Sequence, residues 1–595
     1  MRQEKEFQTS FDPGVWRGLF PYLRPYRRSF AALFVFNLLS AGVDILLPLF
    51  QRYAIDHFIG GNTTEGMGGF AGVYVLCIAA QAIFVILFTR SSMKVEMRFG
   101  QDLRRAQFVH LQELSLSYYN VTPVGWQLSR VMNDTGKISL VLGWNLADIF
   151  WEFLYIIGAF AAMLILDWRL ALPVMIVVPV IALLTWRFQN RILKWNRRVR
   201  LLNSQVTGAF NEGISGAKTA KTLVIEEQTV NEFKELTAEM KHDSVRAARL
   251  SAVYIPLVVF VSTLATALVL VRGGFLERDG LVLLGTLSAF FSYATGLFEP
   301  IQQGARNLTE FISIQACLER VLDLLNEKPQ VQDAPEVVEK YGDAFHPKKE
   351  NWEPIQGDIT FEDVTFRYPD GGENVLTHFD LHIPAGTTVA IVGETGAGKS
   401  TLVNLACRFF EPTEGRVLLD GADLRERSQL WLHSSIGYVL QTPHLFSGTI
   451  LENIRYGRLD ATDEEVYAAA RAVSADTVVA KLEQGYETQV GEGGDRLSTG
   501  EKQLISFARA VLADPRIFVL DEATSSIDTE TEQLIQAAIA RLLEGRTSFL
   551  IAHRLSTIRR ADLILVVQNG QIVERGTHRE LMEQKGYYYD LIESR

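Results

Sequence analysis

The residues best suited to chemistry form a glycine-rich stretch in the second half of the chain, Gly393-Glu394-Thr395-Gly396-Ala397-Gly398-Lys399-Ser400-Thr401. It follows an apolar run and precedes a helical pattern, and residues 393–400 have the spacing G-x-x-x-x-G-K-[ST]. Glycines let backbone N–H groups curl around phosphate oxygens, and the N-terminus of the next helix adds positive potential. Lys399 would reach the β- and γ-phosphates and Ser400 would bind Mg²⁺. The stretch therefore predicts a site for a nucleoside triphosphate with Mg²⁺.

A second candidate is the acidic pair Asp521 and Glu522, which directly follows the apolar run 517–520. Asp521 would end a buried strand beside the metal ion, and Glu522 has the position of a base that polarises an attacking water. An Asp-Glu pair after a strand is also an ordinary way to cap a helix. Its occurrence after a phosphate-binding stretch favours hydrolysis of the nucleotide.

The elements around these residues predict an α/β domain over 357–595, where short β runs alternate with helical stretches. Before it, residues 326–356 are polar, contain four prolines and lack a clear period, which is typical of a linker. Residues 1–325 form the remaining domain.

That first domain contains six apolar runs of spanning length. About 20 helical residues cross a hydrocarbon core of about 30 Å, and none of the runs alternates like a barrel strand. The sequence therefore predicts a membrane domain of six transmembrane helices. The runs are Ser29–Phe50, Phe70–Thr89, Leu140–Leu166, Leu170–Phe188, Ser251–Val271 and Leu281–Ile301.

Lys and Arg predict the orientation of these helices. The N-terminal arm and the loops 90–139 and 189–250 carry twenty-four of them, against four in the loops after the first, third and fifth runs. The positive-inside rule puts both termini and the two long loops in the cytoplasm. No secretory signal precedes the first run, and Val15–Tyr26 is mixed aromatic and basic, which suits a short helix in the cytoplasmic interface.

The two cytoplasmic loops are unusually long and read as helix on both sides of a break. The breaks are residues 117–125 and 213–218. Helices of this length would hold each break about 25–35 Å beyond the bilayer. We interpret the loops as levers that contact a cytoplasmic partner domain; a solvated helical hairpin with no role is the alternative.

Composition excludes several classes of protein. The chain has 595 residues, of which 48% are hydrophobic and 21% charged, with a formal net charge of −11. These values exclude a disordered chain and a disulfide scaffold, and the acidic balance argues against a nucleic-acid partner. Cys77, Cys317 and Cys407 are widely separated and are expected to be buried apolar residues.

Nearly the whole chain resembles an ABC transporter of the exporter type, a half-transporter with six spans fused to one ATPase domain. The most specific segment is Leu497–Gln503, Leu-Ser-Thr-Gly-Glu-Lys-Gln, which is similar to the family signature LSGGQ followed by a basic residue and Gln. Three further matches are Gln441 to the glutamine loop, His553 to the switch histidine and Tyr368 to the aromatic that stacks on adenine. Residues 525–528 resemble the D-loop.

The resemblance implies roles for these residues. Two ATPase domains close head to tail, so that Ser498 and Gly500 of one chain contact the γ-phosphate of ATP on the other. His553 would hold that phosphate and the attacking water. Gln441 would join Ser400 and Asp521 at the Mg²⁺ and signal to the membrane domain, whose loops residues 488–494 would contact. One chain cannot complete a site, so a second half-transporter subunit is required.

Two departures from the signature bear on that partner. Thr499 replaces a glycine and adds a Cβ where phosphate and partner backbone meet, and Glu501 replaces Gln and adds a negative charge near an anion. In heterodimeric exporters the subunit with an intact catalytic Glu often carries the altered signature. The resemblance therefore favours a heterodimer. A homodimer stays open, because Glu also occurs at that signature position in active members.

The sequence says least about the transported substrate. Asp148 and Glu152 are four residues apart and share a helix face, which allows an acidic patch for cationic amphiphiles, although polar packing between helices explains them better. We expect ATP-driven export of an amphiphilic or hydrophobic compound across a bacterial plasma membrane by alternating access. The alternatives are a lipid or lipid-linked flippase, a peptide exporter and, less favoured, an ATP-gated channel or regulator.

Overall fold

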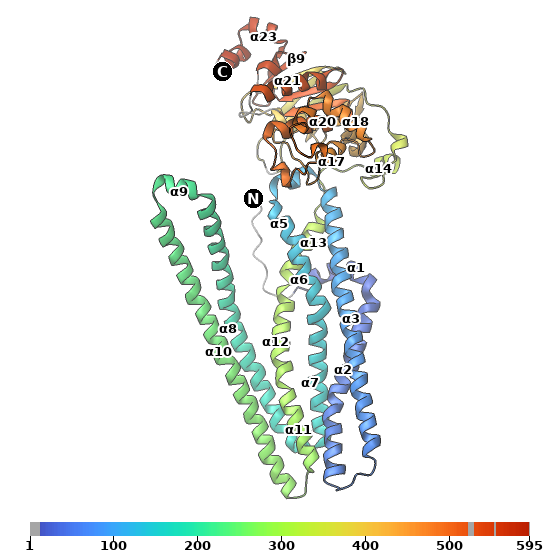
Figure 1. Ribbon diagram of the computed structural model, residues 1–595, viewed down its shortest axis with the longest axis vertical. Coiled ribbons are helices and arrows are strands. Elements are labelled where there is room, and N and C mark those ends of the chain that lie inside the picture. The colour runs from blue at the N-terminus through green and yellow to red at the C-terminus, as the bar shows by residue number, and fades with distance from the viewer. Residues whose placement is uncertain (1–11, 370, 522–528, 552–554, 594–595) are drawn as a thin grey trace. The chain divides into compact units, whose positions relative to one another are not determined.

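The computed structural model describes residues 12–369, 371–521, 529–551 and 555–593. The chain divides into two compact units, each described here by itself. We call Met1–Gln112 with Thr122–Glu327 the helical unit, and Glu113–Val121 with Lys328–Arg595 the α/β unit. Figure 1 labels their elements.

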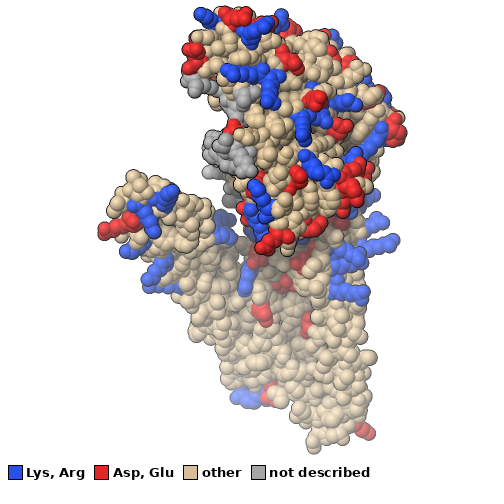
Figure 2. Space-filling view, turned by 45° about the horizontal axis from the view of Figure 1, so that its top comes forward, with Lys and Arg blue, Asp and Glu red and all other residues tan. Residues whose placement is uncertain are grey.

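Long helices dominate the helical unit. Five helical stretches of 43 to 53 residues are long and apolar enough to cross a membrane. They contain the first five predicted spans, and Figure 2 shows a broad surface of this unit with few charged side chains. The helices are α1 (Pro13–Leu23), α2 (Arg27–Ala54), α3 (Met67–Glu113), α5 (Val124–Ser129), α6 (Thr135–Leu140), α7 (Leu146–Leu166), α8 (Trp168–Ser215), α9 (Ala217–Leu223), α10 (Glu226–Arg278), α11 (Leu284–Gly296), α12 (Phe298–Ser313) and α13 (Gln315–Asn326).

The sixth predicted span is divided into two helices. α11 ends at Gly296, Leu297 interrupts the regular pattern, and α12 begins at Phe298. Pro300 lies in the first turn of α12 and cannot donate a backbone hydrogen bond to the carbonyl of Gly296. The run 281–301 thus contains two helices, and Pro300 accounts for the interruption between them.

The amphipathic segment near the N-terminus forms α1, as predicted for a short helix, and it packs against protein. Its Leu19 is fully buried with Leu318 and Val321 of α13. Trp16 stacks on Phe311 of α12, with ring centroids 4.4 Å apart. The side of α1 that carries Trp16 and Leu19 therefore packs on α12 and α13.

Helices α8 and α10 form a long hairpin that closes through α9. Figure 1 shows the two helices side by side, standing apart from the other helices of this unit at the α9 end. The break there is longer than predicted: α8 ends at Ser215, and Val224 ends α9 in a left-handed conformation, with φ 55°. Arg198 of α8 pairs with Asp243 of α10 at 2.8 Å, which ties the hairpin together along its length.

Two sheets form the α/β unit. The six-stranded sheet has the order β10-β9-β3-β8-β7-β6, and the antiparallel four-stranded sheet has the order β2-β1-β4-β5. The strands are β1 (Ile359–Phe366), β2 (Leu376–Ile383), β3 (Thr388–Val392), β4 (Glu414–Leu419), β5 (Ala422–Asp423), β6 (Ile436–Val439), β7 (Ile517–Asp521), β8 (Thr547–Ile551), β9 (Leu563–Gln568) and β10 (Gln571–Gly576).

The central strands β3 and β8 are buried at every residue, which explains why they read as continuous apolar runs. The helices of this unit are α4 (Leu116–Val121), α14 (Pro335–Tyr341), α15 (Lys399–Ala406), α16 (Gln429–Ser434), α17 (Ile450–Arg455), α18 (Asp463–Ala472), α19 (Asp476–Val479), α20 (Thr499–Ala513), α21 (Thr529–Leu543), α22 (Leu555–Ile558), α23 (His578–Gln584) and α24 (Tyr587–Glu593). All of them except α4 and α14 contribute buried residues to the two apolar cores that pack with the sheets.

The segment before β1, predicted to be a linker, contains α14, and from Lys328 on it belongs to the α/β unit. Asp333 pairs with Arg408 at 2.8 Å and accepts a hydrogen bond from the backbone of Gln429. The Arg408 guanidinium also bonds to Glu411 and to the carbonyl oxygen of Arg427. Because Arg408 is only 2% exposed, its charge depends on these partners.

A second cluster anchors the same segment further along. Arg427 pairs with Glu353 at 2.7 Å and donates to the hydroxyl of Tyr341. Burial works against the charge of the Glu353 carboxylate, but hydrogen bonds from Lys340, Tyr341 and Arg427 outweigh it and lower the pKa of Glu353 to about 2. Glu353 also accepts from Trp431 through its backbone carbonyl oxygen. The segment is therefore held by Arg427, just before α16, and by Trp431 within it.

We expect Arg408→Met to destabilise the α/β unit by about 3–5 kcal/mol, because the Asp333 carboxylate is left nearly buried without its cation. Denaturant unfolding of the full chain measures the loss, and hydrogen exchange of residues 328–356 should accelerate. Arg416→Met is the matched control, since Arg416 forms an exposed pair with Glu362 that contributes at most about 1 kcal/mol. Equal effects of the two substitutions would contradict the role of Arg408.

Candidate functional site

Sheet topology brings the predicted nucleotide residues to one edge. β3, β8, β7 and β6 are adjacent and parallel, so their C-terminal ends meet there. The glycine-rich loop follows β3, Asp521 ends β7, and Gln441 follows β6. This edge of an open parallel sheet is where such folds bind ligands. Glu522, His553 and the D-loop residues 525–528 lie outside the described residues, so their roles stay predictions.

The conformation of the loop requires glycine. Gly393 has φ 152°, and a Cβ there would lie 2.2 Å from the carbonyl oxygen of Val567 on β9. Gly396 has φ 87° and open space around the Cβ position. Between these glycines Glu394 and Thr395 are exposed, whereas Ala397, which follows Gly396, is buried. The loop thus packs its base on β9 and leaves its crest free, which is the shape needed to surround phosphate oxygens.

Lys399 starts α15 and turns back over this loop. Its Nζ donates to the carbonyl oxygens of Gly393 and Glu394 at 2.9 and 2.7 Å, and the residue is only 9% exposed. The ammonium group is therefore fixed above the loop, at the N-terminus of a helix, where it adds to the positive potential.

The oxygen groups predicted for Mg²⁺ lie on three different elements. Ser400 is exposed in the first turn of α15, Asp521 is half-buried at the end of β7, and Gln441 is exposed. Hydroxyl, carboxylate and amide oxygens are hard ligands, and two or three of them suit an ion that keeps waters and phosphate oxygens in its shell. The donor set therefore fits Mg²⁺.

Tyr368 is hydrogen-bonded to α15, the helix that begins at Lys399. Its hydroxyl lies 2.9 Å from Oγ1 of Thr401, and its ring packs edge-on against Phe366 and Phe410, with centroids 4.9 and 5.2 Å away. The ring is half-exposed. A flat aromatic face fixed beside the phosphate loop can stack on a base.

The signature residues open α20. Ser498 is the N-cap: its Oγ accepts from the N–H of Glu501, and the Glu501 carboxylate accepts from the N–H of Ser498 at 2.8 Å. This is a capping box, and its spacing Ser-x-x-Glu could have been read from the sequence. Glu501 therefore has a structural partner that the sequence analysis missed. Ser498 and Thr499 are exposed and Gly500 is buried.

The glutamine loop and residues 488–494 are joined by backbone pairing. Thr449 pairs with Gln489, and the N–H of Val490 donates to the carbonyl oxygen of Gly448 at 3.0 Å. Gly494 fits tightly between Leu445 and Lys502, where a Cβ would lie 3.0 Å from the first side chain and 3.2 Å from the second. A movement of the backbone after Gln441 would therefore also move residues 488–494, which precede α20.

Comparison with known proteins matches both halves of the chain. The model of the ABC transporter transmembrane region matches residues 30–301, and that of the ABC transporter family matches residues 376–525. The chain is 38% identical to the uncharacterized ABC transporter ATP-binding protein YfiC of Bacillus subtilis (strain 168), over 99% of this chain and 96% of that protein. The chain belongs to the ABC transporter family.

Other relatives place it among exporters. It is 33% identical to YgaD of Bacillus subtilis (strain 168), which is named as a multidrug export ATP-binding/permease protein, over 97% of this chain and 99% of that one. A bacterial Atm1-family ABC exporter with ATP bound superposes with a TM-score of 0.76 at 27% identity, covering 96% of this chain and 98% of that chain. This ABC transporter is thus an ATP-hydrolysing exporter in the membrane, and its half-transporter architecture implies a dimer.

The acidic residues of the transporter's spans differ in their surroundings. Glu152 of α7 is 5% exposed and accepts a hydrogen bond from Asn307 of α12 at 3.0 Å. About two turns earlier, Asn145, which directly precedes α7, donates to Glu310 of α12 at 2.6 Å. These bonds fit the packing interpretation of Glu152. Asp148 is half-buried on the same helix.

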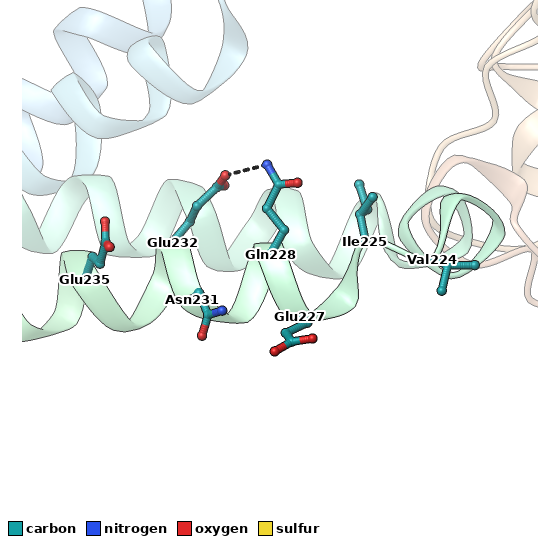
Figure 3. Close-up of a pocket in the computed structure, with 7 residues that line it drawn as sticks. All are labelled: Val224, Ile225, Glu227, Gln228, Asn231, Glu232 and Glu235. Carbon is teal, nitrogen blue, oxygen red and sulfur yellow. Dashed lines mark hydrogen bonds between the residues drawn. The ribbon is translucent and has the colours of Figure 1, made fainter.

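A hollow of about 500 Å³ lies where α9 joins α10. Figure 3 shows its side chains leaving one helix in different directions: Gln228 donates to Glu232 at 2.9 Å, while Glu227 and Asn231 point the opposite way. The carboxylates do not converge on one point. We therefore interpret this hollow as the solvated face of α10 and assign it no ligand.

We expect Glu501→Gln to keep the capping box and to hydrolyse ATP at least as fast as the wild type, because Gln can also accept from the Ser498 N–H. Glu501→Ala should lose the cap, about 0.3–1 kcal/mol of helix stability and part of the ATPase rate. ATPase assays and thermal unfolding of the assembled transporter measure both effects.

The matched control is Glu580→Ala, which removes the equivalent carboxylate of the Thr577–Glu580 capping box on α23. It should cost similar stability without changing the ATPase rate. A Glu501→Gln variant as slow as Glu501→Ala would contradict the capping role.

Proposed function

We propose that this chain pairs with a second half-transporter and couples ATP binding and hydrolysis to export of an amphiphilic or hydrophobic compound by alternating access. The observation that carries the proposal is the exposed signature: Ser498 and Thr499 are exposed at the N-terminus of α20, in the same unit that holds the complete phosphate loop. The N-terminus of a helix can bind a phosphate. The phosphate proposed for α20 belongs to ATP that is held by the phosphate loop of the partner subunit.

Each residue of the nucleotide site has a proposed role. Lys399 and the loop amides of 393–398 bind the phosphates, and Tyr368 stacks on the adenine. Mg²⁺, held by Ser400, Asp521 and Gln441, would neutralise charge on the β- and γ-phosphates. Glu522 takes up a proton from the attacking water, and His553 orients that water and the γ-phosphate.

Coupling to the membrane domain is proposed to use the two loop breaks. The first supports it directly, because Glu113–Val121 belongs to the α/β unit, where Ser115 accepts from the backbone N–H of Val331 at 3.0 Å. At the second break Leu223 and Val224 are 61% and 81% exposed. Apolar side chains this exposed at a helix tip suit a surface that a partner's ATPase domain covers.

For the partner we propose a different half-transporter chain. Thr499 supports this, because its exposed side chain adds bulk on the surface that would meet the partner's phosphate loop. A homodimer is the second candidate, and the capping box supports it: Glu501 is engaged with Ser498, so this departure does not itself imply a weakened signature.

The substrate class and location rest on weaker support. Relatives of this chain are named for multidrug export, and the apolar spans suit a compound that partitions into lipid. A lipid or lipid-linked flippase and a peptide exporter are the alternatives. We propose a bacterial plasma membrane with both termini and the ATPase domain in the cytoplasm, which the Lys and Arg asymmetry supports.

We expect Glu522→Gln to bind ATP like the wild type but to hydrolyse it at least about a hundredfold more slowly, because the general base is lost. A nucleotide titration and a phosphate-release assay separate the two steps. Lys399→Ala is the comparison, since it should weaken nucleotide binding itself. Near-normal turnover in Glu522→Gln would refute the assigned role.

We expect the native mass of the complex, extracted from its own membrane, to correspond to two different subunits. A mass of twice 66.8 kDa from one subunit species would instead establish the homodimer. In that case both composite sites contain Thr499, and the ATPase rate of the purified chain alone should equal that of the complex.

A further inference from the structure

Two hollows adjoin in the helical unit where α1 turns into α2. The first, which we call the apolar hollow, has a volume of about 750 Å³ and is lined mainly by apolar side chains. The second, the basic hollow, has a volume of about 450 Å³ and is lined by prolines and arginines. The two share Pro21, Arg24 and Arg27. Together they offer a basic compartment and an apolar one to a single amphiphilic ligand, and both have the size of a small-molecule site.

The arginines around the two hollows have no acidic partner. Arg24, Arg27 and Arg28 line the basic hollow, and Arg17 lines the apolar hollow together with the first two of them. All four are exposed, and within the part of the chain that the structure describes none of them forms an ion pair with Asp or Glu. Four positive charges therefore lie close together and favour an anion.

The turn that carries these arginines is fixed to the rest of the unit. Arg24–Tyr26 form a single 3₁₀ turn between α1 and α2. Tyr26 is buried, its ring packs edge-on against Phe99 of α3 with centroids 6.1 Å apart, and its hydroxyl donates to the carboxylate of Asp102 on α3. Arg24 and Arg27 are therefore held on either side of an anchored residue, while both remain exposed.

The apolar hollow is formed by residues from three elements. Phe20 and Leu23 belong to α1 and Phe30 to α2, while Leu142 and Leu146 lie at the start of α7. Phe20 is 64% exposed. Such an exposed ring beside other apolar side chains suits contact with a hydrocarbon chain.

The position of the two hollows along the chain identifies the kind of amphiphile. They lie near the start of Pro13–Ile59, a helical stretch long and apolar enough to cross a membrane. At the end of a spanning segment, arginines meet lipid headgroups and apolar side chains meet acyl chains. Basic pockets beside such segments bind acidic headgroups.

We propose that the two hollows bind one acidic phospholipid, with its phosphate between Arg24 and Arg27 and an acyl chain in the apolar hollow. Guanidinium groups match the oxygen geometry of a phosphate and can bind it bidentately. The lipid is a bound component of the transporter. The inference goes beyond the proposed export function, because the site uses none of the nucleotide residues.

Other ligands match only one of the two hollows. A free phosphate pairs with the arginines but leaves the apolar hollow unfilled. A zwitterionic lipid fills the apolar hollow but brings a positive charge toward the arginines. An acidic peptide would place backbone polar groups against apolar side chains without hydrogen-bond partners. An acidic phospholipid satisfies both compartments.

The test uses the assembled transporter in detergent without ATP, and native mass spectrometry follows lipid binding during a titration. The probe is palmitoyl-oleoyl phosphatidylglycerol, and phosphatidylcholine with the same acyl chains is the matched lipid without net charge. We expect phosphatidylglycerol to bind about tenfold more tightly than phosphatidylcholine. Arg24→Gln combined with Arg27→Gln should weaken phosphatidylglycerol about tenfold or more and phosphatidylcholine less than about twofold.

Two further variants separate charge from apolar contact. Phe20→Ser should weaken both lipids by a similar factor, about threefold, because it removes apolar surface and no charge. Arg187→Gln combined with Arg191→Gln is the matched control. It removes two exposed arginines of α8 at the end of another predicted span, and it should bind phosphatidylglycerol like the wild type.

Three results would overturn the inference: unchanged lipid selectivity in the Arg24 and Arg27 double variant, an equal loss in the α8 control, or displacement of phosphatidylglycerol by an equal concentration of glycerol 3-phosphate, which has no acyl chain. If the double variant does not fold, judged by its elution profile and ATP binding, Arg24→Gln alone decides, and wild-type affinity in it overturns the proposal. Because binding is measured without turnover, a failure of the export function leaves this result unchanged.

Discussion

Parallel backbone pairing of β3 with β8, and of β8 with β7, holds the nucleotide site together. The hydrogen bonds of these strands align their C-terminal ends, so a loop and a carboxylate more than a hundred residues apart in sequence share one edge. Every residue of β3 and β8 is buried, and water therefore cannot compete for those bonds. The glycine-rich loop can be held open at its crest because its base is packed on β9, where Gly393 leaves no space for a side chain.

Structural features that depend on neighbouring residues could be predicted from the sequence, and contacts between residues far apart in the chain could not. Apolar runs of twenty residues and the spacing of Gly393, Lys399 and Ser400 identify their structures because each is a property of neighbouring residues. The cap of α20 is equally local, because Ser498 and Glu501 have the spacing of a capping box. By contrast, α14 is too short to show a helical period. The ion pair of Arg408 with Asp333 joins residues far apart in sequence, so no local pattern predicts it. The left-handed conformation of Val224 could not be predicted from residue propensities either, because β-branched residues rarely adopt it.

Side-chain bonds, and not apolar burial alone, define the ends of both units. In the helical unit a bidentate pair between Arg320 of α13 and Asp134, with both distances 2.7 Å, fixes the last helix against the segment before α7. In the α/β unit Asp333 and Glu353 do the same for the segment before β1. Ion pairs of this kind have strict geometry, so they set the position of an element more sharply than contacts between apolar side chains do.

The interruption at Leu297 gives the last span a property that an unbroken helix lacks. Without a donor at Pro300, the carbonyl of Gly296 is released from the helical ladder, and the hydroxyl of Tyr155 lies near the same residue. The span therefore has one backbone hydrogen bond fewer at this point than an unbroken helix, although Leu297 itself keeps a helical conformation. We expect any bending of the span to concentrate there, with α11 keeping its packing on α2 while α12 tilts with α13.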